Sequence, residues 1–191
     1  MKRLEGKTAV VTGGSRDIGR AISVKLAAEG AKVCINYLRN EEKALETLEM
    51  VKAVGGEAIL YRADVTKADE VAAMLKAAAE AFGGKIDILV NNAGGLVGRK
   101  NIEEQDEEWF ETLLNLNFKS CWLCTRDVLK YMDKGSIVNI SSQAARDGGG
   151  PGASMYATAK AAVMCHTRSM AKELGPSGIR VNCVEPGVID T

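Results

Sequence analysis

A tyrosine and a lysine four residues apart are the residues of this chain best suited to acid–base chemistry. Tyr156 and Lys160 belong to the segment Tyr-Ala-Thr-Ala-Lys, and Ser142 lies a short loop before them. On a helix, residues four apart share one face, so the Lys160 ammonium would lie one turn from the Tyr156 phenol. A positive charge there favours the phenolate, and such a tyrosine can exchange a proton with a carbonyl or alcohol oxygen near neutral pH. An isolated Tyr-x-x-x-Lys is more often a surface tyrosine and a solvated lysine, so its meaning depends on the surrounding motifs.

The segments around this pair alternate between short β-branched runs and longer amphipathic runs. The sequence predicts strands at 8–12, 32–37, 57–61, 86–90, 136–140 and 179–184. It predicts helices at 18–29, at 67–82, at about 106–132 and at about 155–174, and a further helix that follows the strand at 32–37 and runs to about 54. Buried strands that alternate with helices indicate a parallel sheet covered on both faces. We therefore expect an α/β fold with a Rossmann-type doubly wound parallel sheet, in a single dinucleotide-binding domain over 1–191, with ligands at the carboxyl ends of the strands.

Composition excludes several classes of function. The 25 basic and 25 acidic residues give zero net charge, which argues against a nucleic-acid surface. Neither a signal segment nor a bilayer-spanning stretch is visible, so we expect a soluble cytoplasmic protein. His166 is the only histidine, which excludes a histidine-based triad or a multi-histidine metal centre. Cys121 and Cys124 match Cys-x-x-Cys, but they lie within a predicted helix without a second pair, so we expect buried thiols and no metal.

A glycine-rich turn, Thr-Gly-Gly-Ser-Arg-Asp-Ile-Gly at 12–19, follows the first predicted strand and opens the first predicted helix. Glycine there lets the backbone approach a pyrophosphate, and the helix N–H groups and dipole favour the anion. Asp64-Val65 ends the third strand, where a carboxylate can meet an adenine amino group. Asn-Asn-Ala-Gly at 91–94 ends the fourth strand, beside the expected switch point. Singly, each of these motifs is typical of a turn.

Together with Asn117 and Pro186-Gly187, these motifs resemble the classical short-chain dehydrogenase/reductase family in order and spacing, over essentially the whole chain. The likeness is closest to bacterial 3-oxoacyl-(acyl-carrier-protein) reductases and the related glucose dehydrogenases. It implies an NAD(P)-dependent oxidoreductase acting on a small or carrier-bound carbonyl substrate, and a homo-oligomer if the C-terminal part were complete. A 3-oxoacyl thioester is the expected substrate, with a sugar or polyol as the alternative.

The resemblance also implies roles for individual residues. Tyr156 would be the general acid/base, and Lys160 would stabilise its phenolate and hold the nicotinamide ribose. Ser142 would hydrogen-bond the substrate oxygen, unless it only caps a strand end. Asn117 would hold the water that links Lys160 to solvent, unless it only bridges two backbone groups. The expected cofactor-binding set is Gly13, Ser15, Arg16, Ile18, Gly19, Tyr37, Arg39, Asp64, Val65, Asn91, Ala93, Gly94, Tyr156, Lys160, Pro186, Gly187 and Val188.

Asp17 departs from the family pattern, which usually has glycine at this point of the turn. Its bulk and charge approach the pyrophosphate, so one reading is that it blocks the dinucleotide. Aspartate is also favoured as a helix N-cap and near the helix dipole, and Arg16 can offset its charge. We expect weaker cofactor binding rather than its loss.

The expected cofactor follows from charge at the end of the second strand. Recognition of NAD uses a carboxylate there to hold the ribose hydroxyls. This chain has Tyr37, Leu38 and Arg39, with no acid before Glu41. Arg16 and Arg39 could flank a 2′-phosphate, so we expect NADP(H), with NAD(H) as the alternative if Arg39 is merely a solvated loop charge.

Family members usually continue for several tens of residues beyond position 191. We therefore expect a truncated chain that lacks the last strand, the substrate lobe and part of the tetramer interface. The strand at 179–184 would then form an apolar edge that favours aggregation. Two alternatives remain: a dinucleotide-binding module without turnover, and a chain that does not fold stably alone.

Overall fold

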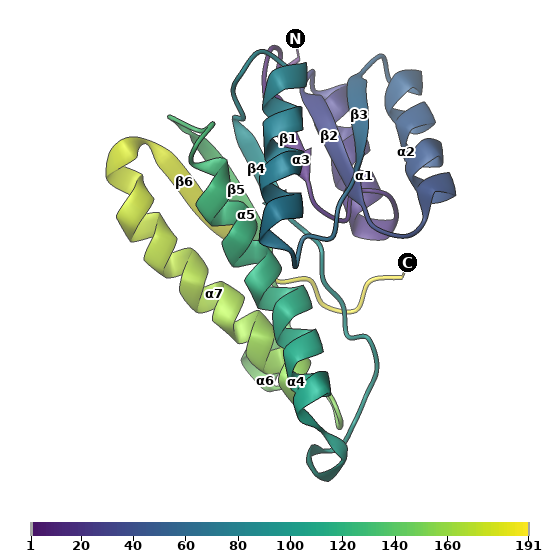
Figure 1. Ribbon diagram of the computed structural model, residues 1–191, viewed down its shortest axis with the longest axis vertical. Coiled ribbons are helices and arrows are strands. Elements are labelled where there is room, and N and C mark those ends of the chain that lie inside the picture. Colours follow the sequence, from purple (N-terminus) through teal and green to yellow (C-terminus); the bar gives the residue numbers. More distant parts are fainter. Residues whose placement is uncertain (1, 191) are drawn as a thin grey trace.

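The computed structural model describes residues 2–190, which build one six-stranded parallel sheet (Figure 1). The strands are β1 (Thr8–Val11), β2 (Lys32–Tyr37), β3 (Glu57–Arg62), β4 (Ile88–Asn91), β5 (Gly135–Ile140) and β6 (Ile179–Val184). Their order in the sheet is β3-β2-β1-β4-β5-β6. Strands β2 and β3 are added on one side of β1, and strands β4 to β6 on the other side. Doubly wound sheets bind their ligands at the switch point between β1 and β4. The predicted Rossmann-type fold is confirmed.

Helices cover both faces of this sheet, as the alternating sequence predicts. They are α1 (Asp17–Ala28), α2 (Glu41–Ala53), α3 (Ala68–Ala81), α4 (Glu107–Leu114), α5 (Ser120–Val128), α6 (Ala144–Asp147) and α7 (Ser154–Leu174), with short 3-10 turns η1 (Ile102–Glu104) and η3 (Gly175–Ser177). Helices α1 and α2 pack on one face, and α3, α5 and α7 contribute to the core on the other. The two faces therefore have separate hydrophobic cores.

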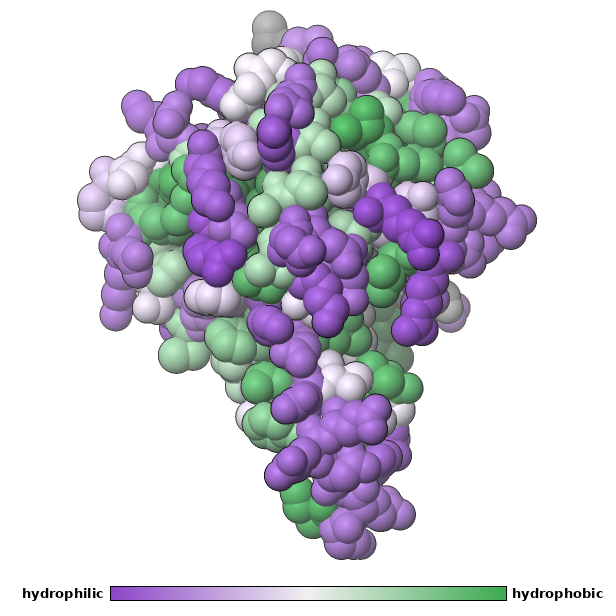
Figure 2. Space-filling model, in the orientation of Figure 1, coloured by the Kyte–Doolittle hydropathy of each residue, from purple (hydrophilic) through white to green (hydrophobic). Residues whose placement is uncertain are grey.

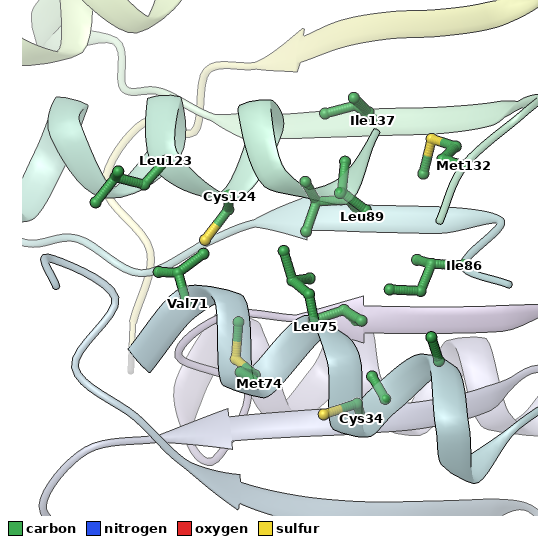
Figure 3. Close-up of a cluster of buried hydrophobic side chains, with 14 of the residues drawn as sticks. Cys34, Val71, Met74, Leu75, Ile86, Leu89, Leu123, Cys124, Met132 and Ile137 are labelled. Carbon is green, nitrogen blue, oxygen red and sulfur yellow. The ribbon is translucent and has the colours of Figure 1, made fainter. Parts of the chain in front are cut away.

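The larger core lies between the sheet and helices α3 and α5 (Figure 3). Leu75 of α3, Leu89 of β4 and Ile137 of β5 are completely buried there. Truncating one such side chain to alanine costs about 2–5 kcal/mol in other proteins, because a cavity remains. This core fixes the strands whose carboxyl ends carry the candidate site.

The single long helix predicted at 106–132 is wrong, because a π-helical segment, η2 (Asn115–Lys119), separates α4 from α5. A π-turn inserts one residue into a helix and often marks a functional position. Asn117 lies inside this turn. Hydrophobic periodicity does not reveal such an insertion, since the apolar stripe continues on both sides of it. The short helix α6 is a second element that the periodicity did not predict.

Strand β6 forms one edge of the sheet, as expected, but that edge is more polar than the sequence suggested. Ile179 and Val181 are buried on the α7 side, whereas Arg180, Asn182 and Val184 alternate with them and are exposed. Two of the three outward side chains are therefore polar. Among residues 2–190, no helix combines the length and the hydropathy needed to cross a membrane.

Candidate active site

Lys160 is a buried lysine that connects α7 to the end of β5. Its side chain is almost fully enclosed, and its Nζ donates a hydrogen bond to the carbonyl oxygen of Ile140 at 2.8 Å. Its own carbonyl oxygen accepts a bond of 2.8 Å from the Ser141 hydroxyl. Burial lowers the pKa of Lys160 to about 8, and the nearby Cys121 and Cys183 thiols partly oppose this shift. The ammonium is thus held in place but poorly solvated.

Tyr156 lies one helical turn before Lys160, on the same face of α7. The Lys160 Nζ is 5.9 Å from the centre of the Tyr156 ring, so the proximity predicted from the spacing is observed. The helix thus brings the two side chains that the proton-transfer hypothesis requires within one turn of each other.

Ser142 lies two residues after the end of β5 and two residues before the start of α6. Its Oγ accepts a hydrogen bond from the backbone N–H of Ala144 at 3.2 Å. This bond closes a turn at the start of α6, whereas the alternative left open by the sequence was a cap at a strand end. A hydroxyl that accepts one bond still has its O–H to donate. The turn contact and a bond to a substrate oxygen are therefore compatible.

Asn117 bridges the backbone on either side of it, and its side chain is buried. Its Oδ1 accepts from the Gly95 N–H at 2.9 Å, and its Nδ2 donates to the carbonyl oxygens of Gly95 and Leu113 at 3.0 Å each. The structural alternative is therefore what the side chain does here. A role in holding water near Lys160 remains an expectation.

Gly94 separates Asn117 from Lys160. A Cβ added at this glycine would lie 2.8 Å from Asn117 Oδ1 and 2.9 Å from Lys160 Nζ. Both polar groups therefore border one small space that only glycine leaves open. This places the π-turn, the loop after β4 and α7 around a common point.

The glycine turn before α1 is packed against the loop after β4. A Cβ on Gly19 would collide with the carbonyl oxygen of Gly13, and Gly13 itself has a φ of 58°. The Nδ2 of Asn92 donates to the carbonyl oxygens of Thr12 and Gly13 at 3.0 Å each. The Oδ1 of Asn36 accepts from the Gly13 N–H at 3.0 Å.

Asn36 and Asn92 thus hold the glycine turn in place, a role that the sequence did not predict. Asn92 belongs to the Asn-Asn-Ala-Gly motif at 91–94, and Asn36 lies in β2, which pairs with β1. Asn91, which was expected to bind cofactor, turns its side chain inward and donates to Thr125 and Asn139 at 3.1 Å and 2.8 Å. Any cofactor contact of Asn91 is therefore left to its backbone.

Asp17 does not act as the N-cap of α1, contrary to expectation. The N-cap is Arg16, whose side chain makes no capping bond, and Asp17 is the first helical residue. Its φ of 52° is left-handed, a region that glycine adopts most readily and that aspartate tolerates better than most residues. As expected, Arg16 offsets its charge, at 3.4 Å from the carboxylate.

The start of α1 fits the pyrophosphate of a dinucleotide. No side chain caps the helix, so its first N–H groups remain free donors beside a turn of small residues. Gly13, Ser15, Arg16, Ile18 and Gly19 would hold this group. A groove of about 640 Å³ begins at this turn and runs along the outer face of α1 to the end of the chain, lined by Asp17, Ile18, Ala21, Ile22, Lys25, Leu26, Ile189 and Asp190.

The other expected cofactor residues differ in burial and in the hydrogen bonds that they make. Val65 is buried in the core beside α3, and Asp64 accepts bonds from the N–H and hydroxyl of Thr66 at 2.9 Å and 2.7 Å. The Ala93 N–H donates to the Thr12 hydroxyl at 3.0 Å. Tyr37 is nearly buried and Arg39 is exposed.

The segment after β6 reaches the site at two of its three expected residues. The Pro186 carbonyl accepts from the Gln143 N–H at 2.9 Å, and Gly187 approaches the Gln143 side chain, so both lie next to Ser142. Val188 is fully exposed and contacts neither loop of the site closely.

The cysteines of the Cys-x-x-Cys segment are buried in α5. Both are free thiols, and burial raises the pKa of Cys121 to about 12 and that of Cys124 further. Thiolates, the reactive and metal-binding form, are therefore disfavoured at both positions. This environment supports the expectation of structural thiols.

Comparison with known proteins identifies the family. The short chain dehydrogenase family model matches residues 7–191. A 3-oxoacyl-[acyl-carrier-protein] reductase of Synechocystis is 41% identical over 194 residues, which cover 100% of this chain and 77% of that protein.

Solved structures agree with this match. A short chain dehydrogenase from Burkholderia cenocepacia in complex with NADP is 39% identical, with a TM-score of 0.94 over 99% of this chain and 77% of that one. An NADH-dependent reductase of alginate metabolism is 34% identical, with a TM-score of 0.94 over 100% of this chain and 80% of that one. The chain belongs to the short-chain dehydrogenase/reductase family of NAD(P)-dependent oxidoreductases.

Proposed function

We propose that this chain interconverts a ketone and a secondary alcohol with NADP(H), and that its substrate is a 3-oxoacyl thioester. The observation that carries the proposal is the buried ammonium of Lys160, fixed by Ile140 and lying 5.9 Å from the Tyr156 ring centre. A lysine is rarely buried without a function, because desolvating its charge is costly. The substrate follows from the name of the Synechocystis relative, whose length this chain matches to 77%.

The bound reduced cofactor supplies the hydride that reaches the carbonyl carbon. Tyr156 donates its phenolic proton to the carbonyl oxygen and accepts a proton there in the reverse direction. Lys160 stabilises the phenolate that remains, because its ammonium is held near the ring in a poorly solvated position. Ser142 donates a hydrogen bond to the same substrate oxygen, where negative charge develops during reduction.

The preference for NADP(H) is supported by the end of β2. Tyr37 and Leu38 occupy the place where NAD-specific sites carry a carboxylate, and Arg16 of the glycine turn and Arg39 after β2 are the basic residues that would flank a 2′-phosphate. The relative bound to NADP shows that this cofactor fits the fold, and the NADH-dependent relative shows that the fold alone does not decide.

The test separates binding from turnover in the purified 191-residue chain. NADPH is titrated by its fluorescence, and reduction of an acetoacetyl thioester by NADPH is then compared with oxidation of glucose by NADP⁺. Replacing Tyr156→Phe should lower kcat by roughly 10²- to 10⁴-fold while NADPH still binds. Tyr131→Phe, a partly buried tyrosine beside the core, is the matched control and should retain activity.

Three results would point elsewhere. NADPH binding without any turnover would indicate a dinucleotide-binding module, and glucose oxidation without thioester reduction would indicate the sugar dehydrogenase. Turnover that survives Tyr156→Phe would contradict the acid–base role of Tyr156.

A further inference from the structure

Arg62 lies at the place where a dinucleotide fold distinguishes the two cofactors. It is the last residue of β3 and pairs in register with Tyr37, the last residue of β2. Its Nε donates a hydrogen bond to the carbonyl oxygen of Leu38 at 3.1 Å. The end of the second strand is where such folds hold the adenosine ribose. Arg62 is thus tied to the backbone of that region, although it lies on a neighbouring strand and outside the glycine turn.

The electrostatics of Tyr37 agree with a guanidinium close to the end of β2. Burial and then the Glu41 carboxylate raise the pKa of Tyr37, and Arg62 opposes this shift. Both charged groups therefore act on the Tyr37 phenol from close by. Glu41 is exposed in the first turn of α2, where the helix dipole stabilises it.

The three arginines of this region differ in two respects: whether the guanidinium is already paired with a carboxylate, and whether a hydrogen bond fixes the side chain. Arg16 already contacts the Asp17 carboxylate at 3.4 Å. Arg39 is exposed and makes no side-chain hydrogen bond or ion pair within residues 2–190. Arg62 is fixed through Nε to an uncharged carbonyl, which leaves both terminal nitrogens of its planar fork to donate to an anion.

We infer that Arg62 determines selectivity for a 2′-phosphorylated dinucleotide by donating its terminal N–H groups to the 2′-phosphate, with Arg39 closing over the same group. Preorganisation favours Arg62 over Arg39, because less side-chain freedom is lost on binding. This inference rests on the proposed NADP(H) dependence and names the residue that would produce it.

The experiment uses small probes that need no turnover. Binding of 2′,5′-ADP and of 5′-AMP to the whole chain is measured by calorimetry, since the two differ in the 2′-phosphate alone. Replacing Arg62→Gln should weaken 2′,5′-ADP at least about tenfold and leave 5′-AMP within about twofold. Arg62→Lys should fall between them, because charge remains but the fork is lost.

Arg180→Gln is the matched control, since Arg180 is an exposed arginine on β6 at the opposite edge of the sheet. It removes the same charge and should change neither affinity. The preference of the unmodified chain for 2′,5′-ADP should also shrink as salt rises from 50 to 500 mM.

The outcomes separate this inference from the proposed function. Selectivity for 2′,5′-ADP that is unchanged in Arg62→Gln overturns the role of Arg62 and leaves NADP(H) dependence standing. Equal affinity of the unmodified chain for both probes overturns both. An equal loss of both probes in Arg62→Gln shows that Arg62 only shapes the loop after β2, and it also overturns the inference.

Discussion

Lys160 illustrates how a buried charge costs stability in return for chemistry. Its folded-state pKa of about 8 lies below the ordinary value of 10.5 because its ammonium is desolvated. The folded protein therefore releases this proton at lower pH than the unfolded chain does. The cost of burying the charge is present in full below pH 8 and is relieved as the pH rises toward 10.5.

Replacing Lys160→Met should remove this pH dependence. Relative to the variant, the unmodified chain should gain about 3 kcal/mol of unfolding free energy between pH 8 and 10.5. Urea unfolding at several pH values measures the difference in unfolding free energy between the two proteins. The titration of the buried thiols is common to both proteins and cancels in this difference. Lys172→Met, in the exposed last turn of α7, is the control and should show no such trend.

Asp17 combines a strained backbone with a charge near the expected pyrophosphate. Asp17→Gly should stabilise the chain by about 1 kcal/mol, because glycine adopts the φ of 52° without strain. It should also bind NADPH several-fold more tightly. Asp17→Asn keeps the tolerance for a left-handed backbone and removes only the charge.

Comparing the two Asp17 variants by thermal unfolding and fluorescence titration separates strain from charge. A gain in affinity that appears in both variants belongs to the charge. A gain confined to Asp17→Gly belongs to the backbone, and a loss of affinity in either would contradict the account given for this turn.

At the scale of elements, the π-turn η2 joins the loop after β4 to the helices α4 and α5. Asn117→Ala removes three hydrogen bonds from a buried site, two of them to the backbone of Gly95 in the loop after β4. We expect a loss of about 2–4 kcal/mol in unfolding free energy. Asn115→Ala, at the first position of the same turn, is the comparison.

The same variant bears on the two readings of Asn117. If the side chain only bridges backbone, kcat should fall no more than the folded fraction does. If Asn117 also holds water for the proton relay, kcat should fall further at temperatures where the variant is fully folded, with a changed pH profile. Stopped assays on samples of known folded fraction distinguish these results.

The sequence predicts elements well where one periodicity continues and poorly where local hydrogen bonds decide. All six strands and the helices α1, α2, α3 and α7 follow from alternating apolar runs, with ends displaced by at most two residues. The π-turn depends on side-chain bonds of Asn117 to a loop about twenty residues earlier, which no local pattern records.

Site residues divide in the same way. Tyr156 and Lys160 are predictable because a helix fixes their relative placement. The inward turn of Asn91 and the clamps made by Asn36 and Asn92 depend on strand order and register, and hence on the assembled sheet. A sequence can suggest these residues by motif but cannot assign their partners.

At the scale of the molecule, the two ends of the sheet are protected differently. Helices α1 and α2 pack over β1, β2 and β3, whereas the outward side chains of β6 on the same face are exposed. The narrow end of the molecule, formed by η1 and the start of α4, is mainly hydrophilic (Figure 2). The edge at β6 is therefore the expected site of association between chains.

Val184→Lys should slow aggregation several-fold, because a charge on an edge strand opposes pairing with another chain. Val184 is 48% exposed and Val54, at the end of α2, is 40% exposed. Val54→Lys is therefore a matched control that changes net charge equally away from the edge. Light scattering below the unfolding temperature gives both rates, and equal rates would exclude β6 as the site.

The candidate site has a proton-transfer half around Lys160 and a dinucleotide half around the glycine turn. The hydrogen bonds that build the two halves differ in the sequence separation of the residues they join. The bonds that fix Lys160 join residues 19 and 20 apart, whereas those from Asn92 to the glycine turn join residues 80 and 79 apart. Contacts between distant residues form late, because a long loop must close before they are made. The proton-transfer half should therefore be in place before the dinucleotide cradle during folding. A mutation that slows closure of the cradle would delay cofactor binding while leaving the Tyr156–Lys160 pair already assembled.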